Sequence, residues 1–385
     1  MHSSNGVFIP VYPSLRPTEL FAAPSEHWKH VFPFNRSSGL WTFSGRVALH
    51  AGIQRLGLPP QSTILFPSYF EGAEINTLLA SGFKLRFYHV DRNFHAALED
   101  IEKRLDDDIS ALYIIHYFGI PQRLAPILAL CRRHGIALIE DCALSLFSSD
   151  HDIPLGASGD MALFSVYKTL PVPHGGFLVS KMGFPNVALH KPPSRSTFFQ
   201  TADLLVQHIK TQAPGRMLLE RLWTTTENLR RTLAKTTVVS GSTEWDPRLL
   251  CYSASPIVGR LIQAVKPAEI VRRRRNNFTF LLSMLADTGA PAITELSQGV
   301  CPLFFPLLVN ERAQFRQALS ARGIGSVSFW SKNHSACPEP FVSAAARWRQ
   351  QLVEIPIHQQ LHEEHMERIG HTCAELLNKP CYRTT

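Results

Sequence analysis

Two kinds of apolar segment alternate along the chain between residue 44 and about residue 180. Short, nearly continuous apolar runs predict buried strands, and longer stretches with helical spacing lie between them. The predicted strands are 62–67, 84–90, 111–116, 136–140 and 161–165. The predicted helices are 48–56, 72–81, 98–105 and 124–134. Because apolar strands separated by helices are typical of a parallel sheet covered on both faces, we expect an α/β domain here.

The pattern changes in the second half of the chain. Segment 192–196 looks like a loop, and 201–237 carries amphipathic helical stretches broken by Pro214-Gly215, which would suit a connector or a subunit contact. The segments that follow are a helix at 257–265, a long basic helix, a strand at 300–309, a helix at 313–322 and a late strand at 352–358. We therefore expect a large domain with an N-terminal arm and a helical connector over residues 1–245. A smaller α+β domain would cover 246–385.

The composition is that of an ordinary globular protein. The 385 residues are 45% hydrophobic and 18% charged, and no uninterrupted apolar run reaches the about 18 residues that a transmembrane helix needs. The first residues lack the basic stretch and apolar core of a secretory signal. Seven scattered cysteines form no Cys-x-x-Cys pair, so neither a zinc site nor a disulfide framework is indicated. These features predict a cytoplasmic protein with no metal site and no membrane partner.

The net charge of +8 could indicate a nucleic-acid or membrane surface, but much of it is local. Four consecutive arginines, Arg272–Arg275, lie in the basic helix. We interpret them as a solvated helix face rather than a nucleic-acid-binding surface, because no nucleic-acid-binding motif accompanies them. A weaker alternative is that one of these arginines reaches an anionic substrate.

The residue types that carry chemistry fall at the carboxyl ends of the predicted strands, where ligands of parallel sheets bind. Asp141 ends one strand, and Lys168 follows another, ahead of Gly175-Gly176. A lysine can form a Schiff base with an aldehyde cofactor, and burial together with the nearby cofactor cation would help it to lose its proton. A strand-end carboxylate can hold a pyridine nitrogen protonated. These are the two groups that an enzyme using pyridoxal 5'-phosphate (PLP) needs most.

Several short motifs occur in a specific order and spacing. They are 44–49, 67–69, 90–91, 116–119, 140–143, 156–160, 164–165, Lys168, 175–176 and 355–358. Together they resemble the DegT/DnrJ/EryC1/StrS family of PLP-dependent aminotransferases. The resemblance implies the aspartate-aminotransferase (type I) fold. In this fold a mostly parallel sheet of the seven-stranded type lies between layers of helices in the large domain, and a smaller α+β domain follows at the C-terminus.

The resemblance also implies roles for the two central residues. Lys168 would bind the cofactor and then move protons at the substrate carbon, and Asp141 would pair with the pyridine nitrogen. Without a cofactor, Lys168 would be a surface lysine in a loop, and Asp141 would cap the following helix.

The phosphate of the cofactor would lie at the start of a helix, where backbone N–H groups favour an anion. Ser44, Gly45 and Arg46 open that helix, and Ser165 is a second candidate by resemblance. Arg46 stands where the family usually has a small hydroxyl residue. It could bind the phosphate as a charged partner or point to solvent, and Ser165 could equally be a turn residue.

Other positions depart from the family pattern. Glu71 stands where an aromatic residue usually lies over the cofactor ring, so Phe70 is the candidate to stack instead, with Tyr69 as an alternative. Leu144 replaces a glutamine or histidine near the cofactor. Ser253 replaces an asparagine that is supplied to the phosphate across a dimer, and His174 replaces a glutamate.

The remaining substrate-binding candidates are Glu71, His116, Tyr117, His174 and Trp330. Histidines are frequent acid–base groups, and Trp330 lies where the smaller domain could face the substrate. The alternative for His116 is a packed core residue, and for Trp330 a surface loop.

We expect a transaminase that moves an amino group from an amino acid, glutamate by preference, to a keto acceptor. The resemblance points to a nucleotide-linked keto sugar in polysaccharide or natural-product biosynthesis, and to a homodimer with shared active sites. Two alternatives remain open. One is other PLP chemistry, such as a dehydratase or a transferase on an amino acid or carrier-bound substrate. The other is a degenerate PLP fold that serves as a binding subunit.

Overall fold

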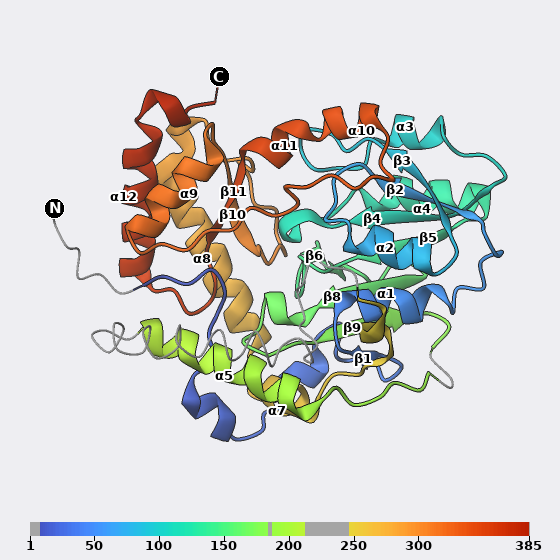
Figure 1. Cartoon of the computed structure of the whole chain (residues 1–385), viewed down its shortest axis with the longest axis horizontal. Helices are drawn as coiled ribbons and strands as arrows, with labels where there is room; N and C mark the ends of the chain where they lie inside the picture. The colour runs from blue at the N-terminus through green and yellow to red at the C-terminus, as the bar shows by residue number, and fades with distance from the viewer. Residues whose placement is uncertain (1–7, 184–186, 212–245, 385) are drawn as a thin grey trace.

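The computed structural model describes residues 8–183, 187–211 and 246–384 of the chain (Figure 1). Its largest feature is a seven-stranded sheet with the order β1-β9-β8-β5-β4-β2-β3. The strands are β1 (Leu40–Thr42), β2 (Thr63–Pro67), β3 (Lys84–Tyr88), β4 (Ile109–Ile115), β5 (Ala137–Asp141), β8 (Met161–Ser165) and β9 (Gly176–Ser180). Strands β8, β5, β4, β2 and β3 run parallel to one another, whereas β9 is antiparallel to both β8 and β1. The expected α/β fold with a mostly parallel sheet is confirmed.

Strands β1 and β9 were not predicted from the sequence. β1 has only three residues, and β9 begins in the Gly175-Gly176 pair that reads as a turn. Gly176 pairs with Thr42, and a Cβ atom at this position would overlap the backbone of Ser44. Glycine is therefore required because two backbones approach closely, which local propensity does not reveal.

Four helices flank the sheet close to their predicted positions. They are α1 (Gly45–Ile53), α2 (Ala73–Ala80), α3 (Leu98–Glu102) and α4 (Leu124–His134). Helix α1 packs against β8 and β9, α2 against β3, and α4 against β5. Helix α4 ends at Gly135, whose φ of 64° is the left-handed conformation that glycine adopts easily.

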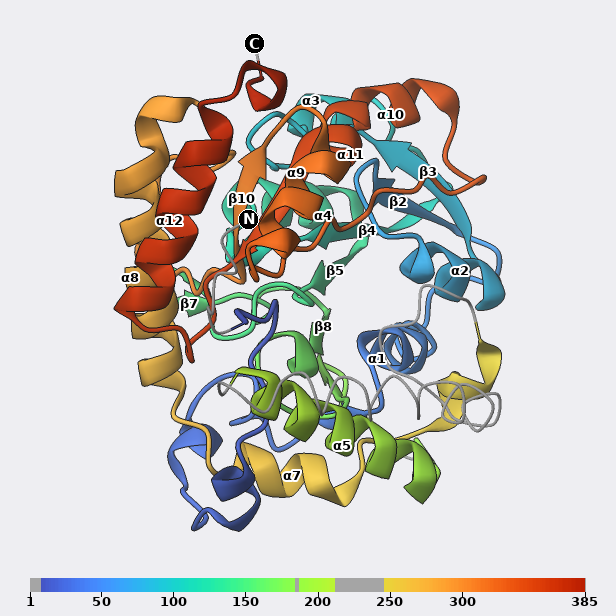
Figure 2. The same cartoon turned by 60° about the vertical axis from the view of Figure 1, so that its left-hand side comes forward.

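The elements of the C-terminal part of the chain lie mostly beside the large sheet, but the helix Glu339–Ala344 lies next to α3 and β3 (Figures 1 and 2). These elements are α8 (Pro267–Leu285), β10 (Phe304–Leu308), α9 (Arg312–Ala321), α10 (Glu339–Ala344), α11 (Ala346–Gln351), β11 (Leu352–Pro356) and α12 (Glu363–Leu377). Strands β10 and β11 form an antiparallel pair, and α8 packs against α12. This arrangement agrees with the expected α+β character, and the division at residue 245 remains a prediction.

The segment between these two groups differs from its prediction. Helix α5 (Ser194–Thr211) begins inside 192–196, which was expected to be a loop. Helix α7 (Pro256–Ile262) has proline at its first position, as helix starts tolerate. Pro214-Gly215 and the rest of the predicted connector up to residue 237 lie outside the described residues.

The four-arginine cluster is only partly a solvated face, because Arg274 is 1% exposed. Its guanidinium donates hydrogen bonds to the carbonyls of Pro302, Leu303 and Thr169. Arg275 bonds the carbonyls of Ser297 and Val300. The apolar spacing that predicts helix α8 does not reveal the partners of these two arginines, because those carbonyls belong to segments outside the helix.

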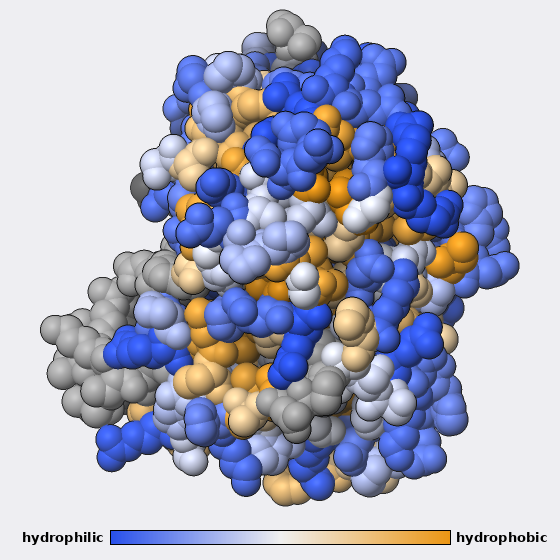
Figure 3. Space-filling view, turned by 90° about the vertical axis from the view of Figure 1, so that its right-hand side faces the viewer, coloured by the Kyte–Doolittle hydropathy of each residue, from blue (hydrophilic) through white to orange (hydrophobic). Residues whose placement is uncertain are grey.

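Hydrophobic residues also lie at the surface, between hydrophilic regions, on the face shown in Figure 3. Among the described residues of the whole molecule, the most exposed large hydrophobic side chains are Phe21, Met182 and Phe198. Among the described helices, none is long and apolar enough to span a membrane.

Candidate active site

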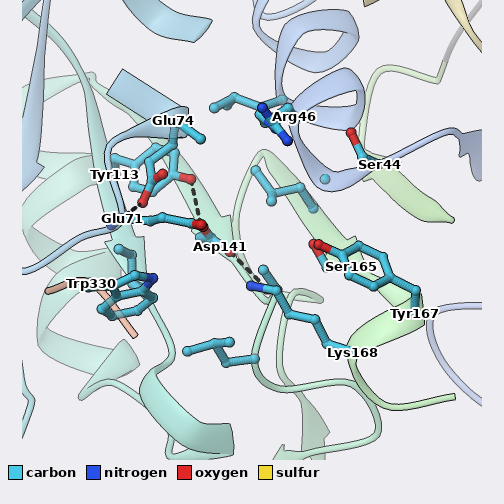
Figure 4. Close-up of a pocket in the computed structure, with 17 residues that line it drawn as sticks. Ser44, Arg46, Glu71, Glu74, Tyr113, Asp141, Ser165, Tyr167, Lys168 and Trp330 are labelled. Atoms are coloured by element: carbon cyan, nitrogen blue, oxygen red, sulfur yellow. Dashed lines mark hydrogen bonds between the residues drawn. The ribbon is translucent and has the colours of Figure 1, made fainter. Parts of the chain in front are cut away.

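A pocket of about 580 Å³ lies at the carboxyl ends of the parallel strands (Figure 4). Its wall includes residues from the start of α1, the β2–α2 loop, β4, the end of β5, and the segment after β8. The residues with functional groups are Ser44, Arg46, Glu71, Glu74, Tyr113, Asp141, Ser165, Tyr167, Lys168 and Trp330. The structure therefore brings together most of the residues that the sequence singled out.

Lys168 lies in a short 3-10 turn, η4 (Val166–Lys168), directly after β8, and its side chain is 8% exposed. In Figure 4 its amino group points toward Asp141. Burial alone would lower the pKa of Lys168, but the neighbouring Tyr167, Glu71, Asp141 and Glu74 together raise it above its ordinary value. Burial acts in the expected direction but is outweighed by these neighbours, and the effect expected of the cofactor cation remains a prediction.

Asp141 is the last residue of β5 and is held by two hydrogen bonds. The hydroxyl of Tyr113 donates to its Oδ2 at 2.6 Å, and the backbone N–H of Ala143 donates to its Oδ1 at 2.8 Å. Burial raises the pKa of Asp141, although these two bonds and the charge of Lys168 act in the opposite direction. The carboxyl group is therefore fixed in orientation in a desolvated position, ready for a cationic partner.

Tyr113 was not among the predicted site residues, although a signal for it exists. In the pairing of β4 with β5, Ile115 lies beside Asp141. Side chains two residues apart in a strand point to the same face, so Tyr113 shares the face of Ile115. The two-residue repeat of side chains along β4, counted back from Ile115, would have identified Tyr113 as a site residue.

The opposite end of the pocket suits an anion. Ser44 precedes α1, and its hydroxyl is buried without a hydrogen-bond partner among the described residues. A Cβ atom on Gly45 would lie 2.6 Å from the Oγ atom of Ser165, so the helix start and β8 approach closely. Arg46 lines the same region. Backbone N–H groups of a helix start, two hydroxyls and a guanidinium are groups that bind phosphate.

Glu71 and Glu74 give the pocket an acidic wall, and Glu74 was not predicted. Glu74 accepts hydrogen bonds from the backbone N–H groups of Glu71 (3.0 Å) and Gly72 (3.2 Å) at the start of α2. Burial, followed by the charges of Glu71 and Asp141, raises the pKa of Glu74 to about 7. Glu74 therefore both shapes the β2–α2 loop and adds negative potential to the site.

Trp330, Leu144 and Tyr167 complete the wall. Trp330 is 7% exposed, and its indole Nε1 is buried without a hydrogen-bond partner. Leu144 lines the pocket where the family pattern suggested a polar side chain. Tyr167 was missed because it precedes Lys168 in a turn, whose geometry the sequence does not specify.

Two predicted residues of the aromatic core do not reach the pocket. Phe70, the candidate to stack on the cofactor, packs instead between Phe66 and Phe87, with ring centroids 5.8 and 5.9 Å away. The hydroxyl of Tyr117 donates to the carbonyl of Tyr69 at 2.6 Å. Both side chains are buried in the core, Phe70 from the β2–α2 loop and Tyr117 from the turn after β4, so they pack there and do not make the predicted contacts.

His116 is also placed behind the pocket wall. Its Nε2 lies 3.0 Å from Oε2 of Glu140, and its Nδ1 accepts the backbone N–H of Gln122. Glu140 also accepts backbone N–H groups of Gly156 and Ser158. Glu140 and Cys142 lie near enough to His116 for a shared metal ion, but these hydrogen bonds already use the polar atoms of the first pair. These hydrogen bonds give His116 a structural role in place of the substrate contact that was predicted for it.

His174 and Ser253 lie outside the pocket as well. His174 stacks on Phe43 at 4.4 Å and accepts the backbone N–H of Ser255, and burial lowers its pKa to about 4. It is therefore a neutral packed residue instead of the predicted substrate ligand. The hydroxyl of Ser253 donates to the carbonyl of His190, so a contribution from Ser253 across a dimer remains a prediction.

The functional groups that line the pocket fit PLP. A buried amine, Lys168, and a buried carboxyl, Asp141, face one another in one half of the pocket. The unpartnered Ser44 hydroxyl at the start of α1 lies in the other half. An aldehyde, a pyridine nitrogen and a phosphate would each meet the group that binds it.

Comparison with known proteins supports the relation inferred from the motifs. Residues 36–183 match the model of the DegT/DnrJ/EryC1/StrS aminotransferase family. Over 136 residues the chain is 34% identical to the dTDP-4-dehydro-2,3,6-trideoxy-D-glucose 4-aminotransferase of Saccharopolyspora spinosa. This match covers 34% of this chain and 35% of the relative, so the similarity spans about a third of each protein.

Solved structures extend the similarity of the fold to nearly the whole chain. Helicobacter pylori PseC, an aminotransferase involved in the biosynthesis of pseudoaminic acid, has a TM-score of 0.69 at 15% identity. That comparison covers 97% of this chain and 99% of the other. A GDP-4-keto-6-deoxymannose-3-dehydratase with bound GDP-perosamine has a TM-score of 0.65 at 16% identity, over 94% and 99% of the two chains. The predicted fold class is confirmed.

Proposed function

We propose that this chain is a PLP-dependent aminotransferase of the DegT/DnrJ/EryC1/StrS family, whose model matches residues 36–183. It would move an amino group from an amino acid to a keto acceptor. The observation that carries this proposal is the pocket in which Lys168 faces Asp141, with the start of α1 at the opposite end. Each of these three features would bind one part of the cofactor.

When bound, the cofactor would supply an electron-poor ring that stabilises negative charge at the substrate carbon. Lys168 would hold the cofactor through Nζ and later move the proton at the carbon that carries the amino group. Asp141 would hold the pyridine nitrogen protonated, with Tyr113 fixing the orientation of the carboxylate. Ser44, Ser165 and the backbone N–H groups of α1 would bind the phosphate.

The acidic wall sets a condition on this chemistry. Its negative groups raise the pKa of Lys168, so the amine is protonated before the cofactor binds. Pairing of Asp141 with a cationic ring would remove part of that negative potential. Cofactor binding would then favour the neutral amine that the reaction needs.

We propose a nucleotide-linked keto sugar as the acceptor, as part of polysaccharide or natural-product biosynthesis. The support is the 34% identical relative, whose name describes a 4-aminotransferase of a dTDP-linked dehydro sugar. A second candidate is dehydration with the same cofactor. It is favoured by the similar fold of the GDP-4-keto-6-deoxymannose-3-dehydratase and by Glu71 and Leu144, which depart from the family pattern inside the pocket.

Transfer of the amino group tests the proposal directly. The purified protein is incubated with PLP, an amino acid donor and a nucleotide-linked keto sugar, and formation of the keto acid and of the amino sugar is followed. Formation of both, dependent on Lys168 in a Lys168→Ala control, supports transamination. Loss of water from the sugar without net amino transfer would instead support the dehydratase alternative, and an unchanged sugar with every donor would contradict both.

We also propose that the chain forms a homodimer in the cytoplasm. Helix α5 supports a subunit contact, because Phe198 is 68% exposed and only Ser196 of the helix is buried. All seven cysteines are free, which suits a reducing compartment. Light scattering on the purified protein and on a Phe198→Glu variant tests the dimer, which the charged side chain should weaken.

A further inference from the structure

Arg349, on helix α11, connects the two parts of the molecule. It is 4% exposed, although its long charged side chain would ordinarily lie at the surface. Its Nη1 donates hydrogen bonds to the carbonyls of Phe70 (3.1 Å), Trp330 (2.7 Å) and Lys332 (2.8 Å). Its Nη2 donates to the carbonyl of Ser68 (3.1 Å). One guanidinium therefore ties the β2–α2 loop to the loop that contains Trp330.

Each of these loops places one residue in the wall of the pocket. Glu71 directly follows Phe70, whose carbonyl Arg349 binds, and Trp330 is bound through its own carbonyl. Trp330 has a positive φ of 51°, a left-handed conformation that is unfavourable for a bulky side chain. Such strain persists only where surrounding contacts impose it. The bond from Arg349 to the Trp330 carbonyl is such a contact.

The indole of Trp330 is also held from the side. Its ring packs edge-on against Tyr69 and Tyr117, with centroids 4.9 and 5.4 Å away. Figure 4 shows Trp330 and Glu71 on the same side of the pocket. The indole nitrogen of Trp330 is buried, and within the described part of the chain it has no hydrogen-bond partner. Buried donors ordinarily have partners, so an unpaired one in a pocket wall indicates an acceptor on a ligand.

We propose that Glu71 and Trp330 recognise the substrate as an acceptor–donor pair, and that Arg349 is the positioning residue that holds both. The group that fits this pair is neutral and both donates and accepts hydrogen bonds, as a hydroxyl or a carboxamide does. A carboxylate could accept from the indole N–H, but the charge of Glu71 would repel it. Arg349 does not line the pocket, and the two cations that do, Arg46 at the start of α1 and Lys168 beside Asp141, belong to the proposed cofactor site.

This inference rests on the proposed function in one respect. An aminotransferase binds its donor and its acceptor in turn in the same pocket, so the pair faces both. It favours a hydroxyl-bearing acceptor, and for the donor it favours glutamine over glutamate, which reverses the preference expected from the family resemblance. Glutamine and glutamate have nearly the same shape and differ in a carboxamide against a carboxylate, so they are matched probes.

The test compares kcat/KM for glutamine and glutamate in the amino-transfer reaction. The wild-type protein should prefer glutamine by about tenfold or more, the range of one hydrogen bond to a charged group. Glu71→Gln should remove most of this preference, and Trp330→Phe should raise KM for glutamine more than it lowers kcat. Arg349→Lys keeps the charge but cannot span four carbonyls, so it should reduce the preference while cofactor binding remains.

Arg275→Lys is the matched control, because Arg275 also bonds two backbone carbonyls but does not line the pocket. It should retain the wild-type preference. The inference is overturned if the wild type prefers glutamate or discriminates neither, or if Glu71→Gln and Arg349→Lys leave the preference unchanged.

Calorimetric affinities for glutamine and glutamate, measured on the same purified proteins with PLP present, separate this inference from the proposed function. Tighter binding of glutamine, lost in Glu71→Gln, without amino transfer would contradict the proposed function and support the recognition pair. Amino transfer with equal affinities for the two amino acids would support the function and overturn the pair.

Discussion

The hydroxyl of Tyr113 lies 2.6 Å from Oδ2 of Asp141 and donates a hydrogen bond to it from the adjacent strand. This bond opposes the effect of burial, which raises the pKa of Asp141. A carboxyl group that must stay ionised to pair with a cationic ring benefits from such a donor. Tyr113 is thus a positioning residue in the proposed cofactor site, and its removal has a specific expected effect.

Tyr113→Phe should weaken PLP binding about tenfold, because a hydrogen bond to a charged group contributes about 1.5–3 kcal/mol and the variant loses it. It should also raise the pKa of Asp141 further. Titration of the protein with PLP, followed by absorbance, measures the affinity. Tyr88→Phe is the matched control, since Tyr88 is a buried tyrosine that bonds the carbonyl of Tyr113 but does not line the pocket. Equal affinities in both variants would contradict this role.

Ser44→Ala separates a ligand-binding hydroxyl from a structural one. The Ser44 hydroxyl has no hydrogen-bond partner, so its removal should change the free energy of unfolding by less than about 0.5 kcal/mol. The affinity for PLP should nevertheless fall about fivefold or more, because a phosphate ligand is lost. Thermal unfolding and PLP titration measure the two effects. Ser255→Ala, another buried and unpartnered hydroxyl outside the pocket, should leave PLP affinity unchanged.

Glu354, in β11, should make the protein less stable as the pH rises. Burial raises its pKa from 4.5 to about 8, despite the backbone N–H of Phe329 that donates to its Oε2 at 3.1 Å. A carboxyl group with a higher pKa in the folded protein contributes stability that is complete below pH 4.5 and is lost as the pH rises through about 8. Glu74, with a pKa of about 7, acts in the same direction.

Glu354→Gln removes this titration and keeps an acceptor for the N–H of Phe329. Relative to the wild type, the variant should gain more than about 1 kcal/mol of unfolding free energy between pH 4.5 and pH 8, since one pKa unit corresponds to about 1.4 kcal/mol. Chemical denaturation at both pH values measures the gain. Glu375→Gln, an exposed glutamate paired with Arg322, serves as the control and should show little pH dependence. The same gain in both variants would contradict the assignment.

His116→Ala should act on stability rather than on substrate recognition. It removes the partner of the buried Glu140 carboxylate and the acceptor of the Gln122 N–H, so we expect a loss of about 2–4 kcal/mol. The protein that remains folded should keep its KM for the amino donor. Denaturation and steady-state kinetics check the two parts, and an increase of KM without loss of stability would restore the substrate contact predicted from the sequence.

The residues that could be predicted from the sequence are those whose signal is local. Lys168 and Asp141 each follow an apolar run, and parallel strands bring their carboxyl ends to one edge, so pattern and topology suffice to pair them. Helix α4 was recognised over its full length because its apolar spacing is regular and Gly135 ends it. The short strand β1 was missed because three residues carry no period.

Other site residues depend on partners far away in the chain. Glu74 and Arg349 resemble ordinary charged surface residues in the sequence, and only the fold shows which backbone groups they bind. Phe70 and Tyr117 were expected at the ligand because they stand near strand ends, but the path of each loop decides which way a side chain points. That path is determined by tertiary contacts, among them those of Arg349.

Covalent trapping tests the central claim, that Lys168 and Asp141 form a PLP site, most directly. The protein is incubated with PLP and reduced with borohydride, and the modified residue is located by mass spectrometry of its peptides. We predict a single modification at Lys168, strongly reduced in Asp141→Ala. Modification spread over surface lysines such as Lys181, or its persistence at the same level in Lys168→Ala, would contradict the account.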